Sequence, residues 1–139
     1  MAGQLGYRSK FFRGATQIAY ARTITPPEPS RDRVDSTHLE SADFVRESVA
    51  GFIDYPEMTV ECIAVDGNAA QEQLEQDFYD GSAAAETWSY QVCDNDTGVT
   101  QRTYTFQGYI SGALRGPIST EELLLLTIKI QLTSSVTIT

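Results

Sequence analysis

Residues 122–139, with the sequence ELLLLTIKIQLTSSVTIT, decide the fold class. Apolar side chains occupy every second position from Leu124 to Leu132 and return at Val136 and Ile138. A period of two residues is typical of a β-strand with one buried face. Because strands of globular proteins usually have ~5–6 residues, we expect this one either to bend across two sheets or to pair at its end with another chain.

The rest of the chain holds further strand patterns and one helix pattern. Alternation predicts strands over residues 16–25, 31–39, 57–65, 87–93 and 102–110. Residues 69–79 follow Asn68, a good N-cap, and end before an Asp-Gly pair, so they predict a short helix. Its only apolar stripe consists of Ala70, Leu74 and Phe78, which means that the helix must lie on another element.

Two segments do not fit any period. Residues 1–14 contain three glycines and predict an extended N-terminal arm. Residues 40–55 are polar and unpatterned, and we interpret them as a long loop. That loop nevertheless carries five apolar side chains, which are Phe44, Val45, Val49, Phe52 and Ile53.

These elements predict a mainly β fold, an antiparallel β-sandwich or flattened barrel with one flanking helix. We expect residues 15–139 to form a single domain behind the arm of residues 1–14. An open sheet of this kind has edges, which must be protected or used for assembly. The sequence has few features that would protect them.

Charge and composition exclude several classes of protein. The net charge is −9, with 10 basic and 19 acidic residues. This balance argues against a protein that binds nucleic acid, because binding to phosphates requires clustered basic residues. No apolar run approaches the ~20 residues needed to cross a bilayer, and the first residues lack the apolar core of a signal peptide. We therefore expect a cytosolic protein that does not insert into a membrane, in which Cys62 and Cys93 are buried free thiols.

No residue pattern indicates catalysis, a metal site or a cofactor. His38 is the only histidine, so it most simply decorates the surface of a polar strand. The triplet Asp96-Thr97-Gly98 lies between two strand patterns and predicts a hairpin turn, and the segment lacks the ligands of a calcium loop. We predict a protein that is not an enzyme and needs no cofactor.

The order of elements resembles a known family. The segments that carry the resemblance are ATQIAYARTIT, RVDSTHLESADFVRESVAGFIDYPEMTVECIAV, the helix ending LEQDFYDG, TWSYQV, TYTFQGYISGAL and the C-terminal run. Together they are similar to the major tail tube proteins of long-tailed, siphophage-type phages, prophages and gene transfer agents, which are related in fold to type VI secretion tube proteins. The resemblance covers nearly the whole chain, although no single segment is diagnostic.

The resemblance implies a structural role. In that family, subunits form homohexameric rings that stack into a hollow tube, and double-stranded DNA passes through it from the head to the host cell without specific binding. The implied partners are further copies of the chain, a tape-measure protein, a tail terminator and a distal tail or baseplate initiator. The implied location is the cytoplasm of the producing bacterium during assembly and then the tail of the particle.

The resemblance also assigns roles to residues. The loop would contact a neighbouring subunit or ring through its five apolar residues, with Arg46 and Glu47 setting the register; a loop folded over its own core is the alternative. The arm would make contacts through Tyr7, Arg8, Lys10 and Arg13. The lumen-facing candidates are Asp32, Asp35, Thr59, Glu61, Thr127 and Lys129, although alternation alone does not show which polar face lines a bore.

Two other functions remain open at this stage. One is another ring-forming structural protein of a phage tail or type VI system, such as a terminator or inner tube protein, which would differ in whether it stacks into long tubes. The other is a small-ligand carrier with a cavity lined by aromatic side chains, namely Trp88, Tyr90, Tyr104 and Phe106.

Overall fold

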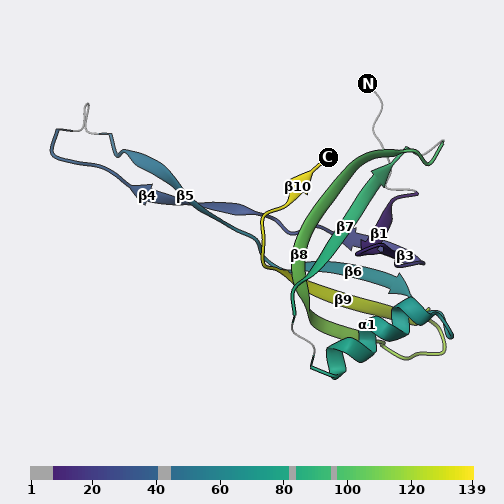
Figure 1. Cartoon of the computed structure of the whole chain (residues 1–139). Coiled ribbons are helices and arrows are strands. Elements are labelled where there is room, and N and C mark those ends of the chain that lie inside the picture. Colours follow the sequence, from purple (N-terminus) through teal and green to yellow (C-terminus); the bar gives the residue numbers. More distant parts are fainter. Residues whose placement is uncertain (1–7, 41–44, 82–83, 95–96) are drawn as a thin grey trace.

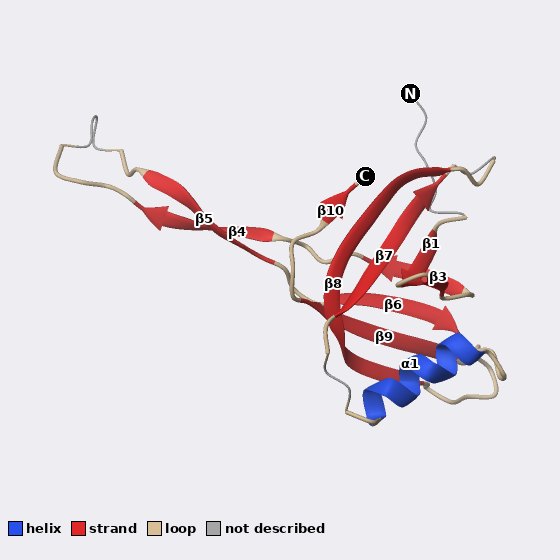
Figure 2. Cartoon of the chain, viewed as in Figure 1, coloured by secondary structure: helices blue, strands red, loops and turns tan. Residues whose placement is uncertain are grey.

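The computed structural model describes residues 8–40, 45–81, 84–94 and 97–139 (Figure 1). Strands dominate, and the described residues include one helix, as Figure 2 shows. The elements in chain order are β1 (Lys10–Arg13), β2 (Thr16–Gln17), β3 (Ala21–Thr25), β4 (Ser30–Asp35), β5 (Ser48–Asp54), β6 (Met58–Ile63), α1 (Ala69–Tyr79), β7 (Glu86–Cys93), β8 (Thr100–Arg115), β9 (Leu125–Leu132) and β10 (Thr137–Ile138). The predicted antiparallel, mainly β fold with one flanking helix is confirmed.

Eight strands form one bent antiparallel sheet in the order β2-β1-β7-β8-β9-β6-β3, with β10 paired to β8. The bend lies in β8, whose residues 100–108 pair with β7 while residues 108–115 pair with β9. The two halves of the sheet fold toward each other over the core, and the sheet stays open rather than closing into a barrel (Figure 1).

Gly108 lies at this bend. A Cβ atom at that position would come within 2.5 Å of the carbonyl oxygen of Gln131 on β9. The Gly108 carbonyl also accepts a hydrogen bond of 3.0 Å from the indole nitrogen of Trp88. Glycine therefore allows the backbones of β8 and β9 to approach closely where β8 changes partner.

The core fills the space between the two halves of the sheet. Phe11 stacks on Trp88 with ring centroids 5.7 Å apart, and both side chains are fully buried. The other half contributes the inward residues of β6 and β9, which alternate as the sequence predicts: Met58, Val60, Cys62, Leu126, Ile128, Ile130 and Leu132. Cys62 and Cys93 are buried thiols that form no disulfide, as predicted.

Helix α1 has the predicted bounds and covers one end of the sheet (Figure 2). The Asn68 side chain accepts a hydrogen bond from the Gln71 amide at 3.1 Å and so caps the first turn. Leu74 is fully buried, and so is Gln71, whose side chain bonds to the backbone of Ala19, Ile63 and Val65. Gln71 therefore fastens the helix to the Ile63 end of β6 and to the β2–β3 connection.

Two predicted irregular segments contain strands. The prediction of a long loop over residues 40–55 is wrong for Ser48–Asp54, which form β5 and pair with β4. The prediction of an extended arm over residues 1–14 is wrong for Lys10–Arg13, which form β1 and pair with β7. Phe11 and Phe12 are adjacent, and only Phe11 is fully buried. The apolar residues of β1 therefore do not alternate with polar ones, and the sequence shows no strand period there.

Two predicted strands are interrupted. Residues 16–25 divide into β2 and β3 at Tyr20, which has a positive φ of 63°. The C-terminal run ends at Leu132 and resumes as β10. In the interruption, the Ser134 hydroxyl accepts a hydrogen bond from the Gln107 amide and donates one to the Ser135 carbonyl. Both parts of this run lie along β8, so the final strand pairs within the chain. The bend across the sheet occurs in β8 instead.

Candidate assembly surfaces

Strands β4 and β5 form a hairpin that projects away from the body of the molecule (Figure 1). Its two strands make a separate sheet, with Arg33 opposite Ala50 and Val34 opposite Val49. All of its strand residues are exposed except Gly51, which is half-buried. The alternative of a loop folded over its own core is therefore wrong for the described residues, and the apolar side chains face outward.

The two faces of the hairpin differ in chemistry. Paired residues of antiparallel strands share a face, so Val34 and Val49 lie together, and 51% and 53% of their surfaces are exposed. Phe52 is 86% exposed and lies with Gly51 in the bulge opposite Asp32. The opposite face carries Arg31, Arg33, Asp35 and Ile53, as the register shows, and is cationic on balance.

Arg46 and Glu47 hold the outer part of the hairpin together. Arg46 lies 3.4 Å from the Asp35 carboxylate, and the Glu47 carboxylate lies 3.4 Å from the His38 imidazole. Hydrogen bonds from Thr37, and then from Arg46, lower the pKa of Asp35. Val45 is exposed here, whereas Phe44 lies outside the described residues. The contacts of Arg46 and Glu47 are thus internal to the hairpin in this single subunit.

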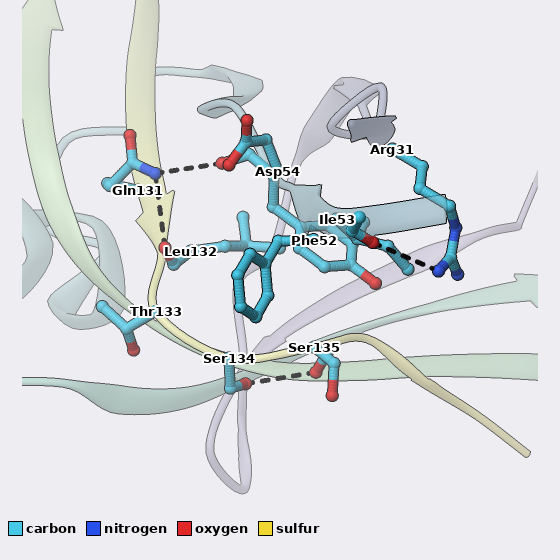
Figure 3. Close-up of a pocket in the computed structure, with 11 residues that line it drawn as sticks. Arg31, Phe52, Ile53, Asp54, Gln131, Leu132, Thr133, Ser134 and Ser135 are labelled. Atoms are coloured by element: carbon cyan, nitrogen blue, oxygen red, sulfur yellow. Dashed lines mark hydrogen bonds between the residues drawn. The ribbon is translucent and has the colours of Figure 1, made fainter. Parts of the chain in front are cut away.

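A cleft lies at the base of the hairpin, between β5 and the link from β9 to β10 (Figure 3). Phe52 and Ile53 contribute apolar surface to it, and Ser134 and Ser135 also line it. Gln131 fixes the base by donating its side-chain amide to the Tyr55 carbonyl at 3.1 Å. The aromatic residues expected of a ligand carrier lie elsewhere: Trp88 and Phe106 are in the core, and Tyr90 stacks on Tyr104.

One half of the sheet has unpaired edges on both sides. This half consists of four strands in the order β8-β9-β6-β3. Among the described residues, β3 pairs only with β6, and residues 109–115 of β8 pair only with β9. Each of these edges presents backbone groups that could bond to another chain.

The central part of the outer face of this four-stranded half is polar, whereas its β8 edge carries the exposed Leu114 opposite Thr127. Thr59 lies opposite Lys129 and Glu61 lies opposite Thr127, so these four predicted residues share one face. Their neighbours in sequence, such as Val60 and Ile128, are buried on the other face. Thr23 and Thr25 of β3 extend the same outer face. The structure therefore brings four of the six lumen-facing candidates together and places Asp32 and Asp35 on the hairpin instead.

Residues near the N-terminus act within the subunit. Arg13 bonds to Asp77 of α1 at 2.5 Å and to Glu86 of β7 at 2.8 Å, and its guanidinium lies over the Trp88 ring. Lys10 lies in β1 opposite Gln91, Arg8 is exposed, and Tyr7 is outside the described residues. Arg13 thus ties β1 to the helix, a role that the predicted arm did not include.

Comparison with known protein families identifies the family of this chain. Residues 9–139 match the family described as Lambda phage tail tube protein, TTP. The chain belongs to this family of tail tube proteins. It is therefore a structural subunit of a phage-type tail and not an enzyme, as predicted. No curated protein matches the chain in sequence.

Solved structures share the fold of this tail tube protein. A chain of the tail of an empty gene transfer agent (GTA) particle has a TM-score of 0.69 at 19% identity, covering 99% of both chains. A chain of the SPP1 tail tube has a TM-score of 0.70 at 12% identity, covering 98% of this chain and 78% of the other. A chain from the PVC sheath/tube terminator of an extracellular contractile injection system has a TM-score of 0.80 at 8% identity, covering 100% of this chain and 98% of the other.

The remaining chemistry of the described residues is structural. No group of three His, Cys, Asp or Glu side chains in that part of the chain is arranged to hold a metal ion. No helix among these residues is long and apolar enough to span a bilayer. Burial raises the pKa of Cys62 to about 11 and that of the half-buried Tyr90 to about 12, which favours the neutral form of both groups.

Proposed function

We propose that this tail tube protein forms six-membered rings through the two free edges of its four-stranded half and that the rings stack into a tube for DNA. In each ring, β3 of one subunit pairs with residues 109–115 of β8 in the next. The observation that carries the proposal is the presence of two unpaired edges on opposite sides of the same four strands. A closed ring removes both edges.

Strand direction supports this pairing. Each neighbouring pair within the four strands is antiparallel, so β3 and β8 at the two sides run in opposite directions. A rotation about an axis roughly along the strands brings β3 of one copy beside β8 of the next, and the antiparallel alternation continues without a break. The copy number of six follows the GTA tail, which was refined with C6 symmetry.

The outer face of the four strands then lines the bore. Its charged residues include Glu61 and Lys129, with Glu57 held on the same face by a hydrogen bond from Ser111. Thr59 and Thr127 lie beside these charged residues, and Thr23 and Thr25 of β3 add further hydroxyl groups. Such a surface has no cationic cluster to bind phosphates, so DNA would pass without specific binding.

The other partners belong to the same proposal. We expect a tape-measure protein inside the growing tube, an initiator at the distal end and a terminator at the head end, with assembly in the cytoplasm of the producing cell. If the protein is itself a terminator, it forms single rings that do not stack. Electron microscopy of purified protein at high concentration, with and without the initiator, distinguishes tubes from single rings and gives the rotational symmetry.

Hydrogen exchange tests the edge pairing without any mutation. In the free subunit, amides of β3 and of residues 109–115 that point away from their partner strand should exchange quickly, whereas β6 and β9 are paired on both sides and serve as the internal control. Assembly should slow exchange at both edges together. Rings in which either edge remains as unprotected as in the subunit would show that the proposed pairing is wrong.

A further inference from the structure

Two charged side chains on the outer face of the four-stranded half have no partner in the described part of the subunit. Glu61 lies on β6 opposite Thr127, and Lys129 lies on β9 opposite Thr59, so the two charges are diagonal neighbours. Neither side chain makes an ion pair or a hydrogen bond with any residue in the described ranges. Both groups are therefore available for a contact outside the subunit.

Lys129 points toward the β8 edge of the sheet. It lies opposite Gly112 of β8, and a Cβ atom at Gly112 would lie 3.5 Å from the Lys129 Cβ and 3.6 Å from its Cδ. The aliphatic stem of Lys129 therefore crosses β8 over the glycine, and the side chain is exposed. This path directs its ammonium group to the edge at which the next subunit would pair.

Glu61 lies near the opposite edge of the same four strands. Only β3 separates its strand from that edge, and Thr23 of β3 lies beside Glu61 on the same face. One edge thus presents a cation and the other a carboxylate. In a head-to-tail ring, unlike charges would meet along each line where β3 of one subunit pairs with β8 of the next, which we call the seam.

The faces of the two edge strands limit how they can pair. Thr23 and Thr25 face outward on β3, whereas Gly112 and Leu114 face outward on β8. Paired residues must share a face, so the possible registers differ in steps of two residues. Without stagger, Thr25 would lie opposite Gly112, because both belong to the row across the sheet that contains Lys129. Closure into a barrel staggers the strands, which disfavours this unstaggered register.

We propose that Lys129 of one subunit forms an ion pair with Glu61 of the next subunit, which sets the seam with Thr23 opposite Gly112. This inference rests on the proposed ring and names the contact that selects its register. The Cα atoms of the two charged residues would lie three strand spacings apart, or about 14 Å. The Lys129 stem crosses one spacing and the Glu61 side chain extends over another. Convergence of side chains on the concave side of a barrel shortens the remainder.

Pairing across the seam would also neutralise a cation of the bore. A ring of free Lys129 ammonium groups would attract the phosphates of DNA in transit. With Glu61 of the next subunit bound to it, each ammonium group is held against the wall and its charge is balanced. The ion pair therefore accounts for a lysine in a conduit that DNA must leave.

Charge reversal in two separate variants tests the pair. Lys129→Glu gives a chain with carboxylates at both positions, and Glu61→Lys gives one with ammonium groups at both, so each variant alone brings like charges together at every seam. The protein concentration at which half of the chains are in rings should rise about tenfold or more for each variant. An equal mixture should assemble like the unaltered protein, because alternating subunits restore unlike charges. Native mass spectrometry should then find equal numbers of the two variants in each ring.

Mixing also excludes a pair within one subunit, since each variant keeps like charges within its own chain. The matched controls are Arg102→Glu and Glu121→Lys, which change the net charge by the same amounts at exposed positions off the central rows of this face. Both should form rings at the normal concentration.

Disulfide crosslinking tests the register without changing any charge. Thr25→Cys and Tyr109→Cys would lie directly opposite each other across the seam, because β8 has its bulge between Ile110 and Gly112. Opposed Cα atoms lie ~4.5–5.5 Å apart, which suits a disulfide. Oxidised rings should give linked chains up to the copy number of one ring. Every link joins two subunits, since β6 and β9 separate β3 from β8 within a chain.

A second cysteine pair is the matched control. Thr23→Cys and Leu114→Cys would be diagonal neighbours in the proposed register, with Cα atoms ~7–8 Å apart, and should not link. In the unstaggered register these two residues are directly opposite each other, so the two cysteine pairs give opposite results in the two registers.

The outcomes separate this inference from the function on which it rests. Absence of rings from the unaltered protein would defeat both. Normal ring formation by Lys129→Glu or Glu61→Lys, or a mixture that assembles no better than the separate variants, would overturn the ion pair and leave the ring intact. Links from the Thr23 and Leu114 pair in place of the Thr25 and Tyr109 pair would overturn the register.

Discussion

Truncation of Phe52 should weaken assembly while leaving the subunit folded. The side chain is 86% exposed in the single chain, so Phe52→Ala removes almost no buried surface from the monomer. Exposed positions of this kind change the free energy of unfolding by less than about 0.5 kcal/mol. We therefore expect a thermal or urea unfolding transition close to that of the unaltered protein.

We propose that the hairpin contacts a neighbouring subunit, and the magnitude of the assembly defect follows from the area of Phe52 that this contact would bury. Complete burial of a phenylalanine side chain is worth about 1.5–3 kcal/mol. A loss of about 2 kcal/mol at each contact lowers its association constant by about 30-fold, since each 1.4 kcal/mol is a factor of ten. Sedimentation should then show tubes of Phe52→Ala only at a correspondingly higher protein concentration.

Two variants make the measurement specific. Val99→Ala removes an exposed apolar group distant from the hairpin and should assemble at the normal concentration. Phe106→Ala opens the core, where the side chain is 2% exposed, and should cost the subunit about 3–5 kcal/mol. If Phe52→Ala forms tubes at the same concentration as the unaltered protein, the hairpin does not bury Phe52 on assembly and our reasoning is refuted.

Three further predictions concern the folded subunit. Arg13→Ala should lower the free energy of unfolding in urea by about 2 kcal/mol, because it removes charge-assisted hydrogen bonds to Asp77 and Glu86. The hydrogen bond from Arg13 also lowers the pKa of Asp77 in the folded state below its ordinary value of 3.8. The stability that this bond supplies is therefore present above pH 3.8 and is lost as the pH falls through the lowered pKa, so Arg13→Ala should reduce the dependence of stability on pH in this acid range. Gln71→Met should cost about 1–3 kcal/mol in the same assay, because it removes the acceptor of the half-buried Val65 amide, whereas Gln73→Met on the exposed side of the helix should change little. Gly108→Ala should fail to give a native circular dichroism spectrum or soluble protein, because its Cβ would meet the Gln131 carbonyl at 2.5 Å, whereas Gly67→Ala, where the space around the Cβ is open, should fold with only the cost of its positive φ of 80°.

Elements whose evidence is local could be predicted from the sequence. Helix α1 was predictable because Asn68, Leu74 and the Asp-Gly pair specify its start, its buried side and its end within thirteen residues of each other. Strands β6 and β9 were predictable because one face of each is buried along its whole length. In both cases the signal comes from burial of one face, which imposes a period on the sequence.

Elements without a buried face left no such signal. Strand β5 lies in a two-stranded ribbon whose partner is the polar β4, so its residues Ser48–Asp54 need not alternate. The bend at Gly108 and the use of β8 by three other strands depend on contacts between distant segments. The grouping of Thr59, Glu61, Thr127 and Lys129 required the register of β6 against β9, which period alone does not fix.

The separation of edges and ends implies an order of assembly. The edges of the four-stranded half lie to the sides of the strands, and the hairpin lies at one end of them. On the proposed arrangement, lateral pairing closes a ring by backbone hydrogen bonds, which a side-chain change at Phe52 does not alter. Contacts with the next ring would use side chains of the hairpin, and an isolated two-stranded hairpin is only marginally stable in water. A closed ring presents all its hairpins in one direction, and the contacts with the next ring form together. Variants of the hairpin should therefore accumulate as closed rings, whereas loss of edge pairing should leave single subunits.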